Sequence, residues 1–360
     1  MLLEGVYAAV PTPFYPDERV YLRKLEANMA HYSRTLLAGM LILGSIGEAP
    51  MVSEEESREI LRVAAEASSP EKVLLAGVGR ESVRSTVELA ELAARFGYDA
   101  VLVRPPSYYA GQMGLAVMLH YYRSIADRSP LPVVLYNVPM YVPCEIPVEI
   151  VAELAMHPNI AGIKDSSGNV DRIAALAAAT RHAPRRTVPV TPVFEAVTAR
   201  MRTPRGEAGL VVIGDRAHGT VAPGAAAHAA APSAAAVPAE PAKTRSKEVG
   251  FQLLCGSGST MLASLEAGAS GAILGFAAFA PQASQEIYFA WKDRNPALAR
   301  EKQERIVGAN RRIVGAFGVP GVKYACDFNG YYGGRARAPL LALSTEEKSE
   351  VASLLAGIRN

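Results

Sequence analysis

A lysine at the end of a short apolar run is the residue best placed to do chemistry in this sequence. The run Ile160–Lys164 is followed at once by the polar residues 165–168, which indicates a buried strand and then a turn into a helix. In a parallel α/β barrel, active sites are built at the C-terminal ends of the strands. A lysine held there among apolar neighbours can be uncharged near neutral pH and attack a carbonyl carbon. The alternative is that Lys164 is solvated, or paired with the adjacent Asp165.

Two further motifs stand where strands are expected to end. Tyr136 closes the apolar run Val133–Tyr136, and its phenol could move protons to and from a carbinolamine and a substrate hydroxyl. A core tyrosine with a partnered hydroxyl is the alternative reading. The segment Gly44–Glu48 follows another such run, and the glycines around Ser45 let backbone N–H groups form an anion site suited to a carboxylate. The same pattern is also an ordinary turn between a strand and a helix.

Other kinds of chemistry have weaker support. The segment Gly256–Ser259 could hold a phosphate, but it lacks the lysine of a P-loop and the spacing of a dinucleotide site. The six histidines form no close cluster with Asp or Glu; they are His31, His120, His157, His182, His218 and His228. A metal-dependent aldolase would need such a cluster. We therefore expect neither a metal nor a cofactor.

Eight strand-like runs recur along the chain, with helical patterns between most of them. They are Val6–Val10, Met40–Leu43, Val73–Val78, Ala100–Val103, Val133–Tyr136, Ile160–Lys164, Phe251–Leu254 and Ala272–Leu274. Ser53 and Glu56 predict a capping box for a helix over Glu54–Ala67, and Gly97 suits the C-terminal end of a helix over Ser85–Phe96. Strands that alternate with helices predict a parallel sheet, and eight such units predict a closed (β/α)8 barrel of the α/β class.

One connection between expected strands is much longer than the others. It contains residues 221–240, in which 11 of 20 residues are alanine. Such a low-complexity tract cannot bury enough side-chain area to hold one conformation. We expect residues 183–250 to be an insertion between the sixth helix and the seventh strand of a barrel formed by residues 1–182 and 251–281. Residues 282–360 are then a C-terminal helical segment.

Within the insertion, Thr191–Met201 has helical spacing and Gly209–Ile213 could form a strand. A connection from a helix to the next strand lies on the N-terminal face of a barrel, away from the chemistry. The insertion is either a tolerated surface segment or an element that binds a partner.

Composition limits the classes of function. The chain has 360 residues, of which half are hydrophobic and a fifth are charged, with a net charge of only +2. No basic stripe with interleaved aromatic residues suggests nucleic acid. Three distant cysteines, Cys144, Cys255 and Cys326, do not suggest a disulfide framework. With no signal-like start and no apolar stretch of about 18 residues, we expect a soluble cytoplasmic protein without a membrane partner.

Taken together, these segments resemble the dihydrodipicolinate synthase/N-acetylneuraminate lyase family, which are pyruvate-linked class I aldolases on a (β/α)8 barrel. The resemblance runs from Gly5 to about Leu343 and leaves out the insertion. It rests on the motifs Gly44-Ser45-x-Gly47-Glu48, Tyr136-Asn137-Val138-Pro139 and Gly162-Ile163-Lys164-Asp165-Ser166. Within the family, the closest likeness is to 4-hydroxy-2-oxoglutarate aldolases, on residues 157–160, 317–321 and 330–334.

The resemblance implies a role for each motif. Lys164 would form the Schiff base with the ketone of pyruvate or another 2-oxo acid, and Tyr136 would be the general acid and base. Ser45 would relay protons and help to hold the carboxylate. Tyr108 would match the tyrosine that family members lend to the neighbouring site across a tight dimer, so a homodimer or homotetramer is expected. The substrate-binding residues are expected to be Ser45, Ile46, Gly47, Tyr141 and Ile273.

Two positions depart from the family pattern. Ile46 stands where the family motif has a second hydroxyl residue, so a side-chain hydrogen bond to the carboxylate is lost while the backbone N–H remains. Tyr141 stands where synthases that condense aspartate semialdehyde usually carry an arginine. A phenol cannot clamp a second carboxylate bidentately. This difference weakens the prediction of dihydrodipicolinate synthase.

The resemblance therefore predicts a Schiff-base lyase that cleaves 4-hydroxy-2-oxoglutarate or a related 2-oxo acid to pyruvate and an aldehyde. The runner-up is dihydrodipicolinate synthase, and a sugar-acid lyase or dehydratase is third. A barrel without catalysis, used for binding or assembly, is the alternative from another class, and Ile46 and Tyr141 are the residues that favour it.

Overall fold

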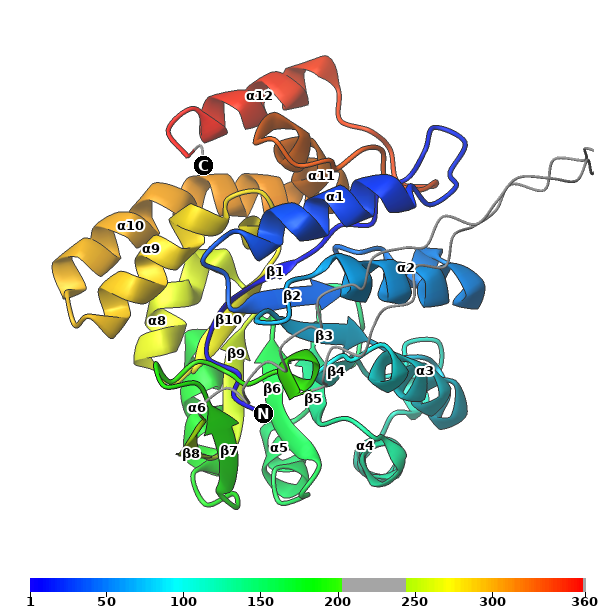
Figure 1. Cartoon of the computed structure of the whole chain (residues 1–360), viewed down its shortest axis with the longest axis vertical. Helices are drawn as coiled ribbons and strands as arrows, with labels where there is room; N and C mark the ends of the chain where they lie inside the picture. The colour runs from blue at the N-terminus through cyan, green and yellow to red at the C-terminus, as the bar shows by residue number, and fades with distance from the viewer. Residues whose placement is uncertain (203–243, 359–360) are drawn as a thin grey trace, which may run out of the picture.

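The computed structural model describes residues 1–202 and 244–358, and within them eight strands close into a parallel barrel (Figure 1). The barrel strands are β1 (Gly5–Ala9), β2 (Gly39–Ile42), β3 (Val73–Gly77), β4 (Ala100–Val103), β5 (Val133–Asn137), β6 (Ile160–Asp165), β9 (Gln252–Cys255) and β10 (Gly271–Leu274). They follow each other around the barrel in chain order, and β10 closes it by pairing with β1. The predicted fold is confirmed, with each strand within a residue or two of its expected bounds.

The strands are apolar on both faces because both faces are covered. Every residue of the eight barrel strands is buried, as expected for a parallel sheet enclosed by helices. Tight contact between strands also requires glycine at particular places. A Cβ atom on Gly162 would lie 2.2 Å from the carbonyl oxygen of Gln252 on β9, so no larger residue fits there without a shift of the backbone.

Helices surround the barrel. They are α1 (Leu22–Ser33), α2 (Glu54–Ala67), α3 (Val83–Arg95), α4 (Leu115–Arg128), α5 (Val148–Leu154), α6 (Val170–Thr180), α8 (Met261–Glu266) and α9 (Pro281–Lys292). Short 3₁₀ turns occupy Ala49–Met51, Ala110–Gln112, Gly258–Thr260 and Phe276–Ala278. The predicted capping box of α2 is confirmed: the Glu56 backbone N–H donates to Ser53 Oγ, and the Ser53 N–H donates to the Glu56 carboxylate. Gly97 follows α3 with φ +80°, as a helix end of this kind requires.

The C-terminal residues add three helices and a π-helical turn beside the barrel (Figure 1). They are α10 (Pro296–Ala309), the turn Asn310–Ala316, α11 (Gly318–Phe328) and α12 (Thr345–Leu355). The expectation of a helical segment over 282–360 is right for these parts and wrong for residues 329–344, which contain no helix. Its start is also shifted, because residues 282–292 belong to α9. None of the helices in the described residues is both long and apolar enough to cross a membrane.

Part of the expected insertion has structure of its own. Strands β7 (Arg186–Val190) and β8 (Arg245–Val249) form a two-stranded antiparallel sheet, and α7 covers Ala199–Arg202. The helix expected over Thr191–Met201 is therefore wrong except at its end. Pro192 disfavours helical geometry at Thr191, and a tight turn forms instead, in which the Thr191 N–H donates to the Glu195 carbonyl. The strand expected at Gly209–Ile213 and the alanine-rich tract lie outside the described residues.

Hydrogen bonds place these elements at the N-terminal ends of the barrel strands. Arg186 donates to the carbonyls of His157, Pro158 and Ile160, where β6 begins. Arg200 donates to carbonyls of the segment that leads from α2 into β3, and the Ala199 N–H donates to Asp99, just before β4. The boundaries 183–250 remain a prediction. The described part of this region covers the end of the barrel opposite Lys164.

Candidate active site

Neighbouring strands bring Lys164 and Tyr136 together. Tyr136 on β5 is in register with Lys164 on β6, and both side chains are buried. Because side chains alternate along a strand, residues in register on adjacent strands share one face. The Lys164 Nζ atom lies 4.3 Å from the centroid of the Tyr136 ring. The two residues that were expected to share the C-terminal rim therefore meet inside it.

Asp165 does not pair with Lys164. Its carboxylate accepts hydrogen bonds from Arg172 Nε at 2.7 Å, from Asn137 Nδ2 at 2.9 Å and from Ser167. In the described residues, Lys164 Nζ makes no hydrogen bond and has no carboxylate oxygen within 4 Å. The alternative reading, in which Lys164 is tied to Asp165, is therefore wrong. Lys164 is left buried without a counter-ion.

Ser45, in the turn after β2, contacts Tyr136. Its Oγ lies 3.2 Å from the Tyr136 hydroxyl oxygen, within hydrogen-bonding distance. The backbone N–H groups of Ser45, Ile46 and Gly47 donate to no protein acceptor among the residues that the structure describes. Three free N–H groups in succession form the kind of site that binds a carboxylate. These three N–H groups are therefore free to bind an anion, and their expected contact with a carboxylate stays a prediction.

A cavity of about 160 Å³ joins these groups at the C-terminal end of the barrel. It is lined by Ala9, Ser45, Ile46, Tyr136, Val138, Met140, Tyr141, Lys164, residues 166–168, residues 256–258, Gly275, Asn310, Val314 and Gly315. Lys164 is the charged member of this described lining. Tyr141 does not replace the missing arginine, because a phenol carries no positive charge in either of its forms. Desolvation, and secondarily Tyr136, raises the pKa of Tyr141.

The other predicted site residues lie elsewhere. Tyr108 is 81% exposed and packs edge-on against Tyr109, outside this cavity. Ile273 is buried in β10, and Gly47 turns its carbonyl oxygen to the Thr12 hydroxyl at 2.6 Å. Neither Ile273 nor Gly47 belongs to the lining of the Lys164 cavity. Their expected contacts with the substrate, and the contribution of Tyr108 across a dimer, stay predictions.

Asn310 is a cavity residue that the sequence analysis did not identify. It begins the π-helical turn, and its amide nitrogen donates to Ser259 Oγ at 2.7 Å. Its amide oxygen is buried, has no hydrogen-bond partner in the described part of the chain and faces the backbone at Gly258. Such turns often occur at functional sites. No sequence signal links a residue after α10 to a strand end so far away along the chain.

No group of three or more His, Cys, Asp or Glu side chains converges as a metal site would in residues 1–202 and 244–358. The chemistry available in the cavity is that of one amine, two hydroxyl groups in contact and a set of backbone donors. An unpaired buried amine can attack a carbonyl carbon, and adjacent hydroxyl groups can carry the protons that such an attack moves.

Comparison with known proteins supports the resemblance read from the motifs. The family model described as the dihydrodipicolinate synthetase family matches residues 2–184 and 240–358. The L-threo-3-deoxy-hexylosonate aldolase of Hypocrea jecorina is 37% identical over 182 residues, which are 49% of this chain and 58% of that protein. A 4-hydroxy-tetrahydrodipicolinate synthase of Xanthomonas axonopodis pv. citri is 38% identical over 182 residues, which are 49% of this chain and 58% of that protein.

A probable mitochondrial 4-hydroxy-2-oxoglutarate aldolase of Emericella nidulans is 34% identical, over 49% of this chain and 59% of its own. The chain thus spans less than two thirds of the length of these curated relatives. Among solved structures, a prophage protein of the dihydrodipicolinic acid synthase family from E. coli K12, in complex with pyruvate, superposes with a TM-score of 0.76. It is 23% identical and covers 99% of both chains, so this likeness concerns the fold.

Proposed function

We propose that this chain, which belongs to the dihydrodipicolinate synthetase family, is a carbon–carbon lyase that needs no cofactor and joins Lys164 covalently to a 2-oxo acid. One observation carries the proposal. A buried amine that has no counter-ion among residues 1–202 and 244–358 stands beside the linked hydroxyl groups of Tyr136 and Ser45 in one cavity. Ser45 and Ile46 line this cavity, and their free N–H groups offer a place for the carboxylate of the 2-oxo acid.

The first half of the reaction joins enzyme and substrate. The Lys164 amine attacks the ketone carbon in its unprotonated form, and one of its two N–H protons passes to the ketone oxygen to give a carbinolamine. Loss of water, with Tyr136 as proton donor, leaves an iminium ion between Nζ and the former carbonyl carbon. Ser45 lies next to the Tyr136 oxygen, so a proton can pass along the two hydroxyl groups, and this step leaves Tyr136 as the phenolate that acts next. The positive iminium nitrogen then attracts electrons from the adjacent carbon–carbon bonds.

The second half breaks a carbon–carbon bond. Tyr136 removes the proton of the hydroxyl on the fourth carbon, that hydroxyl becomes the carbonyl of an aldehyde, and the bond between the third and fourth carbons breaks. Its electron pair moves to the iminium and produces the enamine of pyruvate. Protonation of the third carbon and addition of water release pyruvate and restore the Lys164 amine. The same steps in reverse form the bond.

The preferred substrate is 4-hydroxy-2-oxoglutarate or a close relative. Tyr141 stands at the cavity where an arginine would hold the second carboxylate of a synthase intermediate, and Lys164 is the charged side chain in the described lining. The hydroxyl groups of Ser166 and Ser257 line the same cavity and are available for the distal part of the substrate. The 4-hydroxy-tetrahydrodipicolinate synthase activity remains the alternative.

A second candidate is cleavage of a deoxy sugar acid. A cavity with hydroxyl groups and without a second cation also suits a hydroxylated tail, and the Hypocrea jecorina relative is named for such a substrate. Initial rates with 4-hydroxy-2-oxoglutarate, 2-oxo-3-deoxy sugar acids, and pyruvate plus aspartate semialdehyde separate the three assignments. Preference for the last of these would contradict ours.

Trapping tests the covalent step itself. The protein is incubated with pyruvate and borohydride, and its mass is then measured. We expect one pyruvyl adduct in the native protein and in the control Lys302→Met, which removes a partly exposed lysine, and none in Lys164→Ala. Absence of an adduct in the native protein would favour a barrel used only for binding or assembly.

The proton-transfer roles have their own test. Tyr136→Phe and Ser45→Ala should each lower kcat, with Tyr136→Phe losing about 10²–10⁴-fold. Both variants keep the Lys164 amine and should still be trapped by pyruvate, though more slowly. We also propose a homodimer or homotetramer in which the exposed Tyr108 contacts the neighbouring subunit. A monomer by analytical ultracentrifugation, with full activity, would contradict that part.

A further inference from the structure

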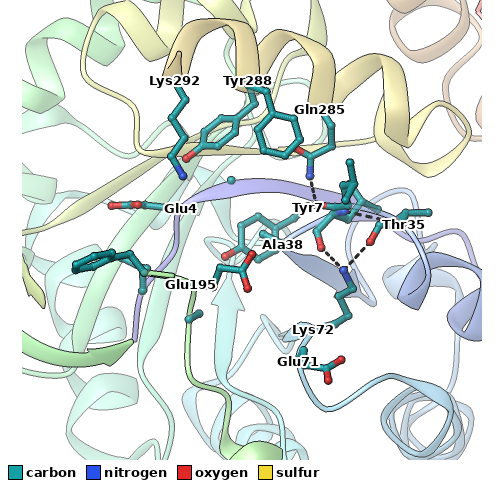
Figure 2. A pocket seen from close by; sticks show the side chains of 17 residues that line it. Glu4, Tyr7, Thr35, Ala38, Glu71, Lys72, Glu195, Gln285, Tyr288 and Lys292 are labelled. Carbon is teal, nitrogen blue, oxygen red and sulfur yellow. Dashed lines mark hydrogen bonds between the residues drawn. The ribbon is translucent and has the colours of Figure 1, made fainter. Parts of the chain in front are cut away.

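A second cavity, of about 210 Å³, lies at the N-terminal end of the barrel, opposite Lys164 (Figure 2). It is bounded by β1, by the segments that lead into β2 and β3, by α9 and by residues 194–196. Residues 185–239 fall outside the family match, so the wall formed by residues 194–196 is a feature of this chain that the family model does not include. This cavity is smaller than the roughly 300–1,000 Å³ typical of drug-sized ligands.

Two polar atoms in its lining are buried without partners. Tyr7 is 0% exposed and its hydroxyl has no hydrogen bond among the described residues. Gln285 is 3% exposed; its amide nitrogen donates to the Leu36 carbonyl, but its amide oxygen has no partner in the described part of the chain. Buried polar atoms are almost always hydrogen-bonded in native proteins. These two atoms are therefore unsatisfied groups with which a ligand or an ordered water in this cavity could pair.

The charged residues around the cavity argue against an ionic ligand. They carry both signs: Glu4, Glu71, Glu195, Lys72 and Lys292. Figure 2 shows Lys292 on one side of the cavity, Lys72 and Glu71 on the other, and Glu195 between them. A cation would approach two lysines, and an anion would approach three carboxylates. A neutral ligand avoids both kinds of repulsion between like charges.

Several of these charges already have partners. Glu4 pairs with Lys247 at 2.5 Å, and Lys72 donates to the carbonyls of Thr35 and Leu37 at 2.7 and 2.8 Å. Glu195 has no ion pair or side-chain hydrogen bond with any other described residue, so its carboxylate is free to accept hydrogen bonds from a ligand. The free groups are thus more often acceptors than donors.

Hydroxyl groups on a ligand would match this set. A hydroxyl donates and accepts at once, so it can donate to the Gln285 oxygen or to Glu195 while accepting from Tyr7. Burial, followed by the charges of Tyr288, Asp99 and Glu4, raises the pKa of Tyr7, so its hydroxyl remains a donor. The rings of Phe194, Tyr288 and Phe289 line the same cavity and offer apolar faces to C–H groups.

We propose that this cavity binds a small neutral polyol, such as a sugar or a sugar alcohol. The ligand would hydrogen-bond to Tyr7, Gln285 and Glu195 and rest against the ring of Phe194. This site uses no residue of the Lys164 cavity, so it does not depend on the proposed lyase activity.

The test is direct binding to the full-length protein. Glycerol, erythritol, xylitol and glucose are titrated by calorimetry and by saturation-transfer NMR, with glutamate and putrescine as charged comparison compounds. We expect saturable binding of at least one polyol and weaker binding of both charged compounds. Tighter binding of a charged compound, or no saturable binding of any polyol, would overturn the proposal.

Variants locate the binding. Tyr7→Phe and Glu195→Ala each remove one hydrogen-bonding group and should lower the affinity for the polyol by about three- to tenfold. Glu248→Ala, on β8 and outside the cavity lining, is the matched control and should leave the affinity unchanged. Lys164→Ala should bind the polyol as the native protein does. Equal affinity in the native protein, Tyr7→Phe and Glu195→Ala would show that only water fills this cavity and that the polyol binds elsewhere.

Discussion

A buried ion pair behind the anion site gives a sharp prediction about stability and activity. Glu48 ends the turn that carries Ser45, and its carboxylate lies 2.5 Å from Lys323 Nζ on α11, with side-chain exposures of 1% and 0%. Lys323 also donates to the Arg335 carbonyl at 2.7 Å, and Glu48 accepts from the Arg337 backbone N–H at 2.8 Å. The pair therefore joins the C-terminal helices to the turn after β2.

Lys323→Met should remove about 3–5 kcal/mol from the free energy of unfolding, because it leaves the Glu48 carboxylate buried without its counter-ion. Glu48→Gln should be similarly costly, since it leaves the ammonium group unpaired. The double variant removes both charges together and should recover a large part of the loss. Lys302→Met is the control: its partly exposed contacts with Glu286 and Glu301, at 3.8 and 3.3 Å, should contribute less than about 1 kcal/mol.

Urea unfolding followed by circular dichroism measures these differences, and pyruvate trapping reports on the site. We expect Lys323→Met to slow trapping as well, because the turn that holds Ser45 loses its anchor. The reasoning is refuted if Lys323→Met costs less than about 1 kcal/mol, or if the double variant loses the full sum of the two single losses.

Three further predictions test other parts of the molecule. Arg337 lowers the pKa of Glu56 below its ordinary value of 4.5, so Glu56→Gln should cost roughly 1–2 kcal/mol at neutral pH. That difference should vanish as the pH falls through the lowered pKa, because a depressed carboxyl pKa stabilises the fold only above it; unfolding curves against pH check this. Tyr141→Arg should lower the KM for 4-hydroxy-2-oxoglutarate about fivefold, from roughly 1 kcal/mol of added pairing with its second carboxylate, without a similar change for pyruvate trapping. Gly162→Ala would place a Cβ 2.2 Å from the Gln252 carbonyl oxygen and should lower stability by roughly 1–3 kcal/mol in thermal unfolding, whereas Gly111→Ala, with open space around it, should change stability by less than about 0.5 kcal/mol.

Much of the barrel could be predicted because its signals are local. Short apolar runs bounded by turn residues predicted all eight barrel strands, since such runs can be buried on both faces only in an enclosed sheet. The strict alternation of side chains along β5 and β6 then placed Tyr136 and Lys164 on the same face. The capping box of α2 was predictable for the same reason, because its partners are three residues apart.

The incorrect or missing predictions concern contacts that the local sequence pattern did not reveal. The helical spacing of residues 191–201 was overridden by Pro192 and by hydrogen bonds from that segment to Pro70 and Asp99, which precede β3 and β4. Asp165 was a candidate partner of Lys164, but its carboxylate pairs instead with Arg172 in the first turn of α6. Asn310 was missed because its place in the cavity depends on how α10 and the π-helical turn pack over β9 and β10.

The sequence by itself thus determined which residues form strands, which strand ends carry reactive side chains and which family the chain resembles. These properties follow from patterns within a few residues, which constrain each residue's conformation and the face it occupies. Only the tertiary structure decided that Lys164 has no counter-ion in the described residues, that Lys323 supports Glu48, and that Tyr7 and Glu195 line one cavity. Each of these depends on approaches between residues far apart in the chain, which the packing of the whole barrel sets and no short segment contains.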